Sequence, residues 1–182
     1  MGAPTLNHQD VAGEMYYQFR NYIDGKKLEA DHTTPDPVEI NALLAEMVEK
    51  GCEYCFMEVS SIGLEQERVA GLEFAAGIFS NLTPDHLDYM GTLDAYYASK
   101  TNIYRNMGEN DVFLLNTDDA ILAEYTEKHP VKCATQTFSI QSTDTDCFEK
   151  DGRLYVCGEE VMLLSDIKIV GRHNLQNVMV AV

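Results

Sequence analysis

The stretch 74-FAAGIFSNLTPDHLDYMG-91 decides the fold when it is taken together with 54-YCFMEVSS-61 before it and 111-DVFLLNTDD-119 after it. Each stretch begins with a short apolar run of the length of a buried strand and continues into polar residues. We therefore expect strands at Tyr54–Val59, Phe74–Asn81 and Asp111–Leu115. Because helical segments alternate with these runs, the pattern predicts an α/β domain with a mainly parallel sheet flanked by helices.

Clear start and stop signals mark a helix before the first strand. Asp36 stands at the N-cap position, Pro37 at the first helical position and Glu39 two residues later, which is typical of a helix start. Gly51 is suited to end this helix. The expected buried stripe consists of Val38, Leu43, Leu44, Met47 and Val48.

Two further helices are expected after the second and third strands. Thr92 is suited to cap a helix over residues 93–107, and Gly108 is suited to follow its end. Asp118 is expected to begin another helix that ends near His129-Pro130.

Turn residues indicate hairpins outside this alternating part. Asp24-Gly25 separates QFRNYI from KLEA, and Asp151-Gly152 is suited to a type I′ turn. After Pro130 the expected strands are short and form a small antiparallel region: Thr135–Ile140, Cys147–Lys150, Leu154–Cys157 and Val161–Leu164. A last helix is expected from Asn174 without a closing signal, so we expect a piece of a longer polypeptide.

The charge of the chain argues against several classes of partner. Thirteen lysines and arginines against thirty aspartates and glutamates give a net charge of −17. Such a chain repels phosphate backbones and anionic lipids, so nucleic acids and membrane surfaces are not expected partners. No apolar run approaches the roughly 18 residues of a membrane span, and the first residues lack a signal-peptide pattern. We expect a soluble, cytoplasmic protein.

Five cysteines are an odd number, and without a secretory signal they predict no disulfide framework. Cys52 and Cys55 form a CxxC pair, which is half of a zinc site or a redox pair, and no second pair completes a tetrahedral set. Because Cys55 opens an apolar run, we expect the pair to pack in the core.

Polar residues gather where the three predicted strands end, which is the edge at which parallel sheets bind ligands. They are Glu58, Ser60, Ser61, Asn81, Thr83, Asp85, His86, Asp88, Asn116, Asp118 and Asp119. Glu58 and His86 offer oxygen and imidazole ligands to Mg²⁺ or Mn²⁺. The alternative is a solvent-facing Glu58 and a loop histidine. Their collection on one edge favours a metal and polar-ligand site.

Pattern alone names no reaction. The sequence contains neither GxxxxGK[ST] nor GxGxxG, and no GxSxG nucleophile motif.

Three motifs resemble a known family. The segments 58-EVSS-61 and 81-NLTPDHLDY-89, followed by Lys100, are similar to the central domain of the Mur ligases, above all to its tripeptide synthetase branch, which adds the third residue of the peptidoglycan stem peptide. The segment 171-GRHNLQN-177 resembles the adenine-contacting segment of the same superfamily. The resemblance covers roughly residues 20–182 and implies a P-loop-NTPase-like fold.

Roles follow from the resemblance position by position. It implies that Glu58 and His86 bind Mg²⁺, and that Lys100 is carbamylated and helps to hold a second Mg²⁺; these three would also be the catalytic residues. Positions that would contact the UDP-MurNAc-dipeptide are Thr33, Thr34, Ser60, Gln66 and Arg68. The asparagines that would bind adenine are Asn174 and Asn177. Two positions at which the family often has histidine are Ile62 and Met90.

The family's GTNGKT phosphate loop, expected before His32, does not occur in this sequence. The resemblance therefore implies that residues 1–182 are an incomplete central, ATP-binding domain without the N-terminal UDP-binding and C-terminal domains. We expect the isolated chain to be inactive.

The implied activity is ATP-dependent amide formation between a UDP-MurNAc-peptide and a free amino acid through an acyl phosphate, with two Mg²⁺ ions, in a cytoplasmic monomer. The alternatives are a folylpolyglutamate or cyanophycin synthetase type of ligase, or a non-catalytic nucleotide-binding or interaction module.

Overall fold

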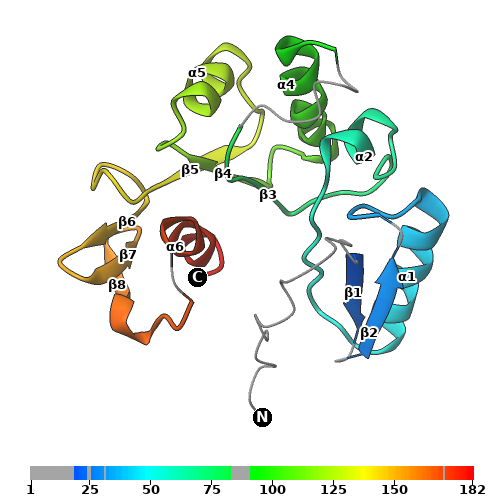
Figure 1. Ribbon diagram of the computed structural model, residues 1–182, viewed down its shortest axis with the longest axis horizontal. Coiled ribbons are helices and arrows are strands. Elements are labelled where there is room, and N and C mark those ends of the chain that lie inside the picture. Colours follow the sequence, from blue (N-terminus) through cyan, green and yellow to red (C-terminus); the bar gives the residue numbers. More distant parts are fainter. Residues whose placement is uncertain (1–18, 24–25, 31, 83–90, 170) are drawn as a thin grey trace, which may run out of the picture. The chain divides into compact units, whose positions relative to one another are not determined.

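The computed structural model describes residues 19–23, 26–30, 32–82, 91–169 and 171–182, with the backbone alone for the first two ranges. The chain divides into two compact units, Met1–Ser60 and Ser61–Val182. Figure 1 shows the helices and strands of both units. Within the described residues, no helix has the length and apolar character needed to cross a membrane.

The first unit contains a hairpin and a helix. Strands β1 (Phe19–Ile23) and β2 (Lys26–Ala30) pair antiparallel with Ile23 opposite Lys26, which confirms the hairpin predicted around residues 24 and 25. The Asp24-Gly25 turn itself lies outside the described residues.

Helix α1 (Pro37–Glu49) has the predicted start and stop. One carboxylate oxygen of Asp36 accepts hydrogen bonds from the backbone N–H groups of Val38 and Glu39, at 2.8 and 3.0 Å. At the other end Gly51 has a φ of 75°, and the N–H of Cys52 reaches back to the carbonyl of Met47. This pattern is a Schellman motif, which requires a residue that tolerates the left-handed conformation.

Three expectations for this unit are wrong: the buried stripe of the helix, the strand over residues 54–59 and the core position of the CxxC pair. The buried residue of α1 is Ile40, whereas Val38 and Val48 of the predicted stripe are exposed. Residues 54–59 form no strand, because no described strand hydrogen-bonds to them, and Tyr54 and Phe56 are 79% and 88% exposed.

The CxxC prediction fails for the same reason. Cys52 and Cys55 are exposed rather than packed in a core, because the segment that carries them has no paired strand to hold it inside.

The second unit is built on a six-stranded sheet in the order β3-β4-β5-β6-β7-β8. The first three pairings, from β3 to β6, are parallel, and the last two are antiparallel. The strands are β3 (Ala76–Phe79), β4 (Val112–Asn116), β5 (Ala134–Ser139), β6 (Cys147–Lys150), β7 (Arg153–Val156) and β8 (Glu159–Leu163). The predicted fold class is confirmed: a mainly parallel sheet with helices and a small antiparallel region.

Helices flank both sides of this sheet. Figure 1 shows α4 and α5 on one side of the parallel strands and α6 on the other. The helical elements are α2 (Ser61–Glu65), α4 (Leu93–Thr101), the 3₁₀ helix η2 (Asn102–Asn106), α5 (Ala120–Lys128), the 3₁₀ helix η3 (Leu164–Asp166) and α6 (Arg172–Met179).

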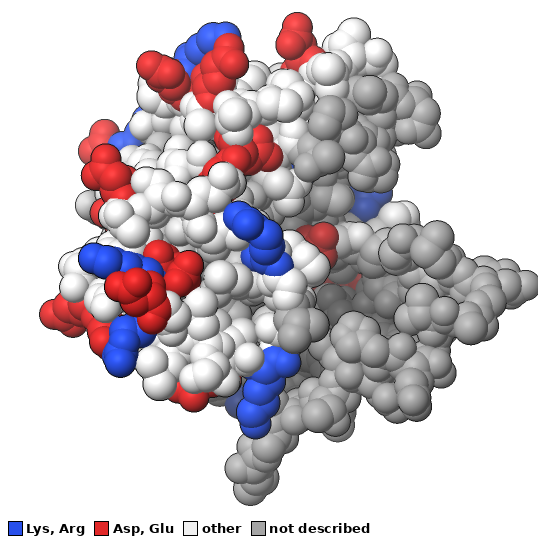
Figure 2. Space-filling model, turned by 60° about the vertical axis from the view of Figure 1, so that its left-hand side comes forward, with Lys and Arg blue, Asp and Glu red and all other residues white. Residues whose placement is uncertain are grey.

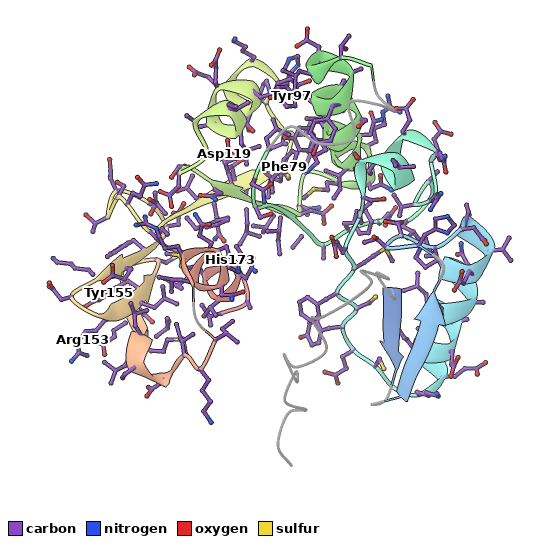
Figure 3. All side chains as sticks on the ribbon, viewed as in Figure 1. Phe79, Tyr97, Asp119, Arg153, Tyr155 and His173 are labelled. Atoms are coloured by element: carbon purple, nitrogen blue, oxygen red, sulfur yellow. The ribbon has the colours of Figure 1, made fainter. Side chains whose placement is uncertain are left out.

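Each side of the sheet has its own core. Side chains that alternate along β3 and β4, among them Phe79, Phe113 and Leu115, pack against Tyr97 of α4 and Leu122 of α5. Figure 3 shows Phe79 and Tyr97 in the layer between these strands and the helices. The second core lies between β5–β8 and α6 and contains Phe138, Cys147, Leu154 and Met179.

Several boundaries differ from the sequence prediction. The helix expected over residues 93–107 is α-helical only to Thr101 and continues as η2 to Asn106. The N-cap of α5 is Asp119 rather than Asp118, and α6 begins at Arg172, two residues before Asn174.

The strand β5 was expected in the antiparallel region, but it pairs parallel with β4. A strand's own residues do not determine the direction of its neighbour. The antiparallel region is therefore β6–β8, which we call the meander.

Both turns of the meander use residues with positive φ. Asp151 and Gly152 both have positive φ, 51° and 74°, as the predicted type I′ turn requires. A second such turn, Cys157-Gly158, connects β7 and β8. Its Cys-Gly sequence is not a typical turn signal, so the sequence did not reveal it.

Candidate functional site

A cavity of about 440 Å³ lies at the carboxyl ends of β3 and β4, beside α6. Its lining includes Ser80, Asn116, Ile121, Ile140, Arg172 and Gln176. A second hollow of about 520 Å³ lies on the segments that lead into β3 and β4. Since open parallel sheets bind ligands outside their carboxyl ends, the first cavity is the candidate site.

The buried amide of Asn116 joins the ends of β3 and β4. Its nitrogen donates to the carbonyl of Ser80 at 2.7 Å, and its oxygen accepts from the backbone N–H of Asp118 at 3.0 Å. Because the side chain is only 3% exposed, these bonds satisfy an amide that would otherwise be costly to bury.

Asp119 makes a second connection at this edge. One carboxylate oxygen accepts from the N–H of Leu122 at 3.0 Å and caps α5, and the other accepts from the N–H of Leu82 at 2.7 Å. Figure 3 shows Asp119 at the beginning of α5. The same carboxylate therefore positions a helix and the chain that leaves β3.

Asp118 connects β5 and α6. One oxygen accepts a hydrogen bond from the hydroxyl of Ser139. The other accepts from the N–H of Ile140 at 2.9 Å and from the side-chain amide of Gln176 at 3.1 Å.

Three of the polar residues predicted at this edge, Asn116, Asp118 and Asp119, lie at the end of β4 and bond to the protein itself. Among the residues that the structure describes, no group of three or more His, Cys, Asp or Glu side chains could hold a metal ion. The carboxylates after β4 act as internal connections, which a sequence pattern cannot distinguish from ligand positions.

The first unit brings three of the predicted positions together. The buried Thr34 hydroxyl accepts from the backbone N–H of Ser60 at 2.9 Å and donates to the carbonyl of Glu58 at 3.1 Å. The carboxylate of Glu58 is on an exposed residue, and Thr33 is half-buried. Residues far apart in sequence are thereby held side by side.

In the second unit, Gln66 and Arg68 follow α2 and contact each other. The Nε and Nη2 atoms of Arg68 both donate to Oε1 of Gln66, at 2.9 and 2.6 Å. Arg68 is half-buried and Gln66 is exposed.

Lys100 is half-buried near the end of α4. Its Nζ atom lies 5.1 Å from the ring centroid of Tyr96, within the range of a cation–π contact. Tyr104, four residues after Lys100, falls in η2, where the α-helical spacing no longer holds.

His86 lies outside the described residues, as do Thr83, Asp85 and Asp88. Glu58 and Lys100 belong to different units. The metal set expected from the resemblance therefore stays a prediction.

Asn174 and Asn177 both lie on α6, half-buried and exposed respectively. The cavity is lined instead by Arg172 and Gln176 of the same helix. Sequence reasoning missed both, although their i, i+4 spacing within 171-GRHNLQN-177 is the signal that places them on one helix face.

On the face shown in Figure 2, acidic and basic side chains of the described residues lie interspersed and do not form separate patches. On α5, Lys128 and Glu124 form an exposed ion pair at 2.5 Å.

The fold and the cavity define an α/β domain of the class that binds ligands at the carboxyl edge of its sheet. The sequence model of the Mur ligase middle domain matches residues 5–182. The chain belongs to the Mur ligase family and corresponds to its middle domain.

Curated relatives agree with this assignment. A UDP-N-acetylmuramoyl-L-alanyl-D-glutamate--2,6-diaminopimelate ligase of Parabacteroides distasonis is 38% identical over 163 residues, which is 87% of this chain and 33% of the relative. The ligase of the same name from Gloeobacter violaceus is 36% identical over 191 residues, covering 99% of this chain and 36% of the relative. The chain spans about a third of the length of these relatives.

A solved structure of a protein with the same ligase name superposes with a TM-score of 0.69. The superposition covers 85% of this chain and 34% of the other, at 24% sequence identity. This similarity confirms the fold.

Proposed function

We propose that this chain is the middle, nucleotide-binding domain of an ATP-dependent ligase that adds an amino acid to a UDP-MurNAc-peptide in peptidoglycan synthesis. The observation that carries the proposal is the family match over residues 5–182, together with relatives that share one ligase name. Within the family, the proposed type is a UDP-N-acetylmuramoyl-tripeptide synthetase. The shared name disfavours the folylpolyglutamate and cyanophycin alternatives.

In the proposed reaction, ATP phosphorylates a carboxylate of the UDP-MurNAc-dipeptide. The amine of the incoming amino acid attacks the acyl phosphate, and the tetrahedral intermediate collapses to the amide with release of phosphate; ADP is the other product. The names of the relatives give L-alanyl-D-glutamate and 2,6-diaminopimelate as the groups that they join. These are the substrates that we propose to test first.

The cavity beside α6 is the proposed place for the nucleotide. Ile121 and Ile140 offer apolar surface to a base, and the guanidinium of Arg172 offers a donor fork to a phosphate. Asn174 and Asn177 are the proposed adenine contacts on the same helix. Asp118 and Asp119 also line this cavity, and each accepts hydrogen bonds from the protein. These bonds fix the positions of the two carboxylates, which supports a cavity of defined shape.

Mg²⁺ is the metal that we propose for the ligase, in two sites, with Glu58, His86 and carbamylated Lys100 as ligands. When bound, it would neutralise phosphate charge. The described residues alone contain no group of three or more His, Cys, Asp or Glu side chains that could hold a metal ion. The proposed substrate contacts are Thr33, Thr34, Ser60, Gln66 and Arg68, and the proposed setting is a cytoplasmic monomer.

The test is made in the complete ligase with Lys100→Ala. A carbamate would turn the amine into a carboxylate, so the variant should be nearly inactive and should regain turnover when a short carboxylic acid is added. Lys100→Arg should not be rescued. Close to normal turnover of Lys100→Ala without added acid would refute the role of Lys100.

Glu58→Ala and His86→Ala are parallel arms of this experiment, and excess Mg²⁺ should partly restore both. The isolated 182-residue chain should form no amide with ATP. Amide formation by the isolated chain would contradict its assignment as one part of a larger ligase. Complete inactivity of an otherwise folded full-length protein would favour the non-catalytic module.

A further inference from the structure

Asn106, the last residue of η2, makes a three-way connection inside the second unit. Its side-chain nitrogen donates to the backbone carbonyls of Val69 and Leu72, at 2.8 and 2.7 Å. Its own backbone carbonyl accepts from the N–H of Phe74 at 2.8 Å. One residue thus holds the segment from Val69 to Phe74 against the end of η2.

The segment held by Asn106 continues directly from Arg68. The N–H of Arg68 donates to the carbonyl of Gly63 at 2.9 Å, so the backbone is fixed before the arginine as well as after it. Glu67 has a φ of 54°, a left-handed conformation that a non-glycine residue keeps only when its surroundings hold it. The buried Val69 side chain, 2% exposed, closes this turn onto the protein.

The other side of the connection is rigid. The element η2 continues from α4, which carries Lys100. The next residue, Met107, is buried against β3 so closely that a Cβ on Gly77 would lie 2.6 Å from its sulfur. Asn106 therefore joins the turn that carries Arg68 to the rigid element that carries Lys100.

We infer that Asn106 is a positioning residue that sets the place of Arg68 relative to Lys100. The inference rests on the proposed function, in which Gln66 and Arg68 contact the anionic UDP-MurNAc-dipeptide. The guanidinium is a planar donor fork, and its bonds to Gln66 restrict its orientation. Small displacements of a positioning group lower binding or rate strongly, because a fork must meet its anion in a defined geometry.

The experiment uses the complete ligase with Asn106→Leu, which keeps the approximate size, and Asn106→Asp, which keeps the shape. Both remove the two N–H donors. The KM for UDP-MurNAc-L-Ala-D-Glu should rise about tenfold, while the KM for ATP should stay within about twofold. Asn110→Asp is the matched control, because it makes the same chemical change at an exposed neighbour and should leave both constants unchanged.

Arg68→Ala serves as the reference that separates the two proposals. If Arg68→Ala raises the KM of the UDP substrate and the Asn106 variants do not, the positioning role is overturned and the proposed function stands. If Arg68→Ala itself has no effect, the substrate contact and the positioning role both fall.

A parallel rise of both KM values together with a lower melting temperature would show a merely structural role and would also overturn the inference. Should both variants fail to fold, Asn106→Ser, which keeps one donor, takes their place. Its expected increase in the KM of the UDP substrate is about threefold, with the KM for ATP unchanged.

Discussion

The parallel strands β3–β5 and the meander β6–β8 belong to one sheet but are held in different ways. The parallel part depends on side chains that reach across the sequence, such as Asp119, which accepts from the N–H of Leu82. The meander is closed by two tight turns, Asp151-Gly152 and Cys157-Gly158, whose residues are neighbours in the chain. The parallel part is thus held by contacts between residues distant in sequence, and the meander by contacts between residues close in sequence.

The junction between the two parts is narrow. Strands β5 and β6 pair through Phe138 with Cys147 and Ser139 with Phe148, whereas β4 and β5 are paired along the whole length of β4. The buried cluster of the meander reaches the parallel part through Phe138 of β5, whereas the other cluster lies on β3 and β4. We therefore expect the parallel part to be destabilised mainly by substitutions that remove contacts between residues distant in sequence. The meander should be destabilised mainly by substitutions in the buried cluster that contains Leu154.

The largest effect is expected for Phe113→Ala. Phe113 is fully buried, with edge-on contacts to Phe79 and Tyr104, so its removal should lower the free energy of unfolding by about 3–5 kcal/mol. Leu154→Ala is the matched change in the meander core, with an expected cost of about 3 kcal/mol. Urea denaturation measures both.

Hydrogen exchange sharpens this comparison. Leu154→Ala should accelerate exchange in β6–β8 more than in β3 and β4, because the narrow junction lets the meander open by itself. Equal acceleration in all six strands would contradict the separation of the two parts.

Asp119→Ala should have the second largest effect. It removes the cap of α5 and the charged acceptor for Leu82, which together cost about 2–4 kcal/mol. Asp119→Asn keeps a good capping oxygen and should cost about half as much. Equal thermal stability of Asp119→Asn and the unchanged protein would show that the connection to Leu82 contributes nothing, and equal stability of the two variants would show that the cap contributes nothing.

A smaller effect, specific to the meander, is expected at alkaline pH. Burial, followed by the charges of Cys157 and Asp146, raises the pKa of Cys147 from 9.0 to about 11. Between these values the unfolded thiol releases its proton and the folded thiol keeps it, so stability falls with rising pH, by about 1 kcal/mol per pH unit.

The measurement is the difference in urea stability between Cys147→Ala and the unchanged protein at pH 8 and at pH 10.5. The difference removes the contributions of other groups that titrate in this range. Cys52→Ala, at an exposed position in the first unit, is the control variant. A difference that is independent of pH would contradict the assignment to Cys147.

Local signals in the sequence predicted local structure well. Asp36 and Pro37 located the start of α1, and Asp151-Gly152 located the turn between β6 and β7. These features depend on neighbouring residues, so their information lies within a few positions of the chain.

Features that depend on distant residues were harder to predict. The direction of β5 is set by its pairing with β4. Tyr54 and Phe56 are exposed because, among the described residues, no strand pairs with the segment that carries them. The same limit explains the site. The sequence predicted a polar edge, but only the fold shows that Asn116, Asp118 and Asp119 bond to the protein itself.

The hydrogen bond between Asp118 and Gln176 has a consequence for synthesis on the ribosome. Its partners are 58 residues apart, so at about 5–20 residues per second roughly 3–12 s separate their translation. During that interval α5 and β5 are added to the nascent chain after β4, but the helix that completes the cavity wall is not yet made. The cavity therefore becomes competent for a ligand late, after the rest of its lining has been made.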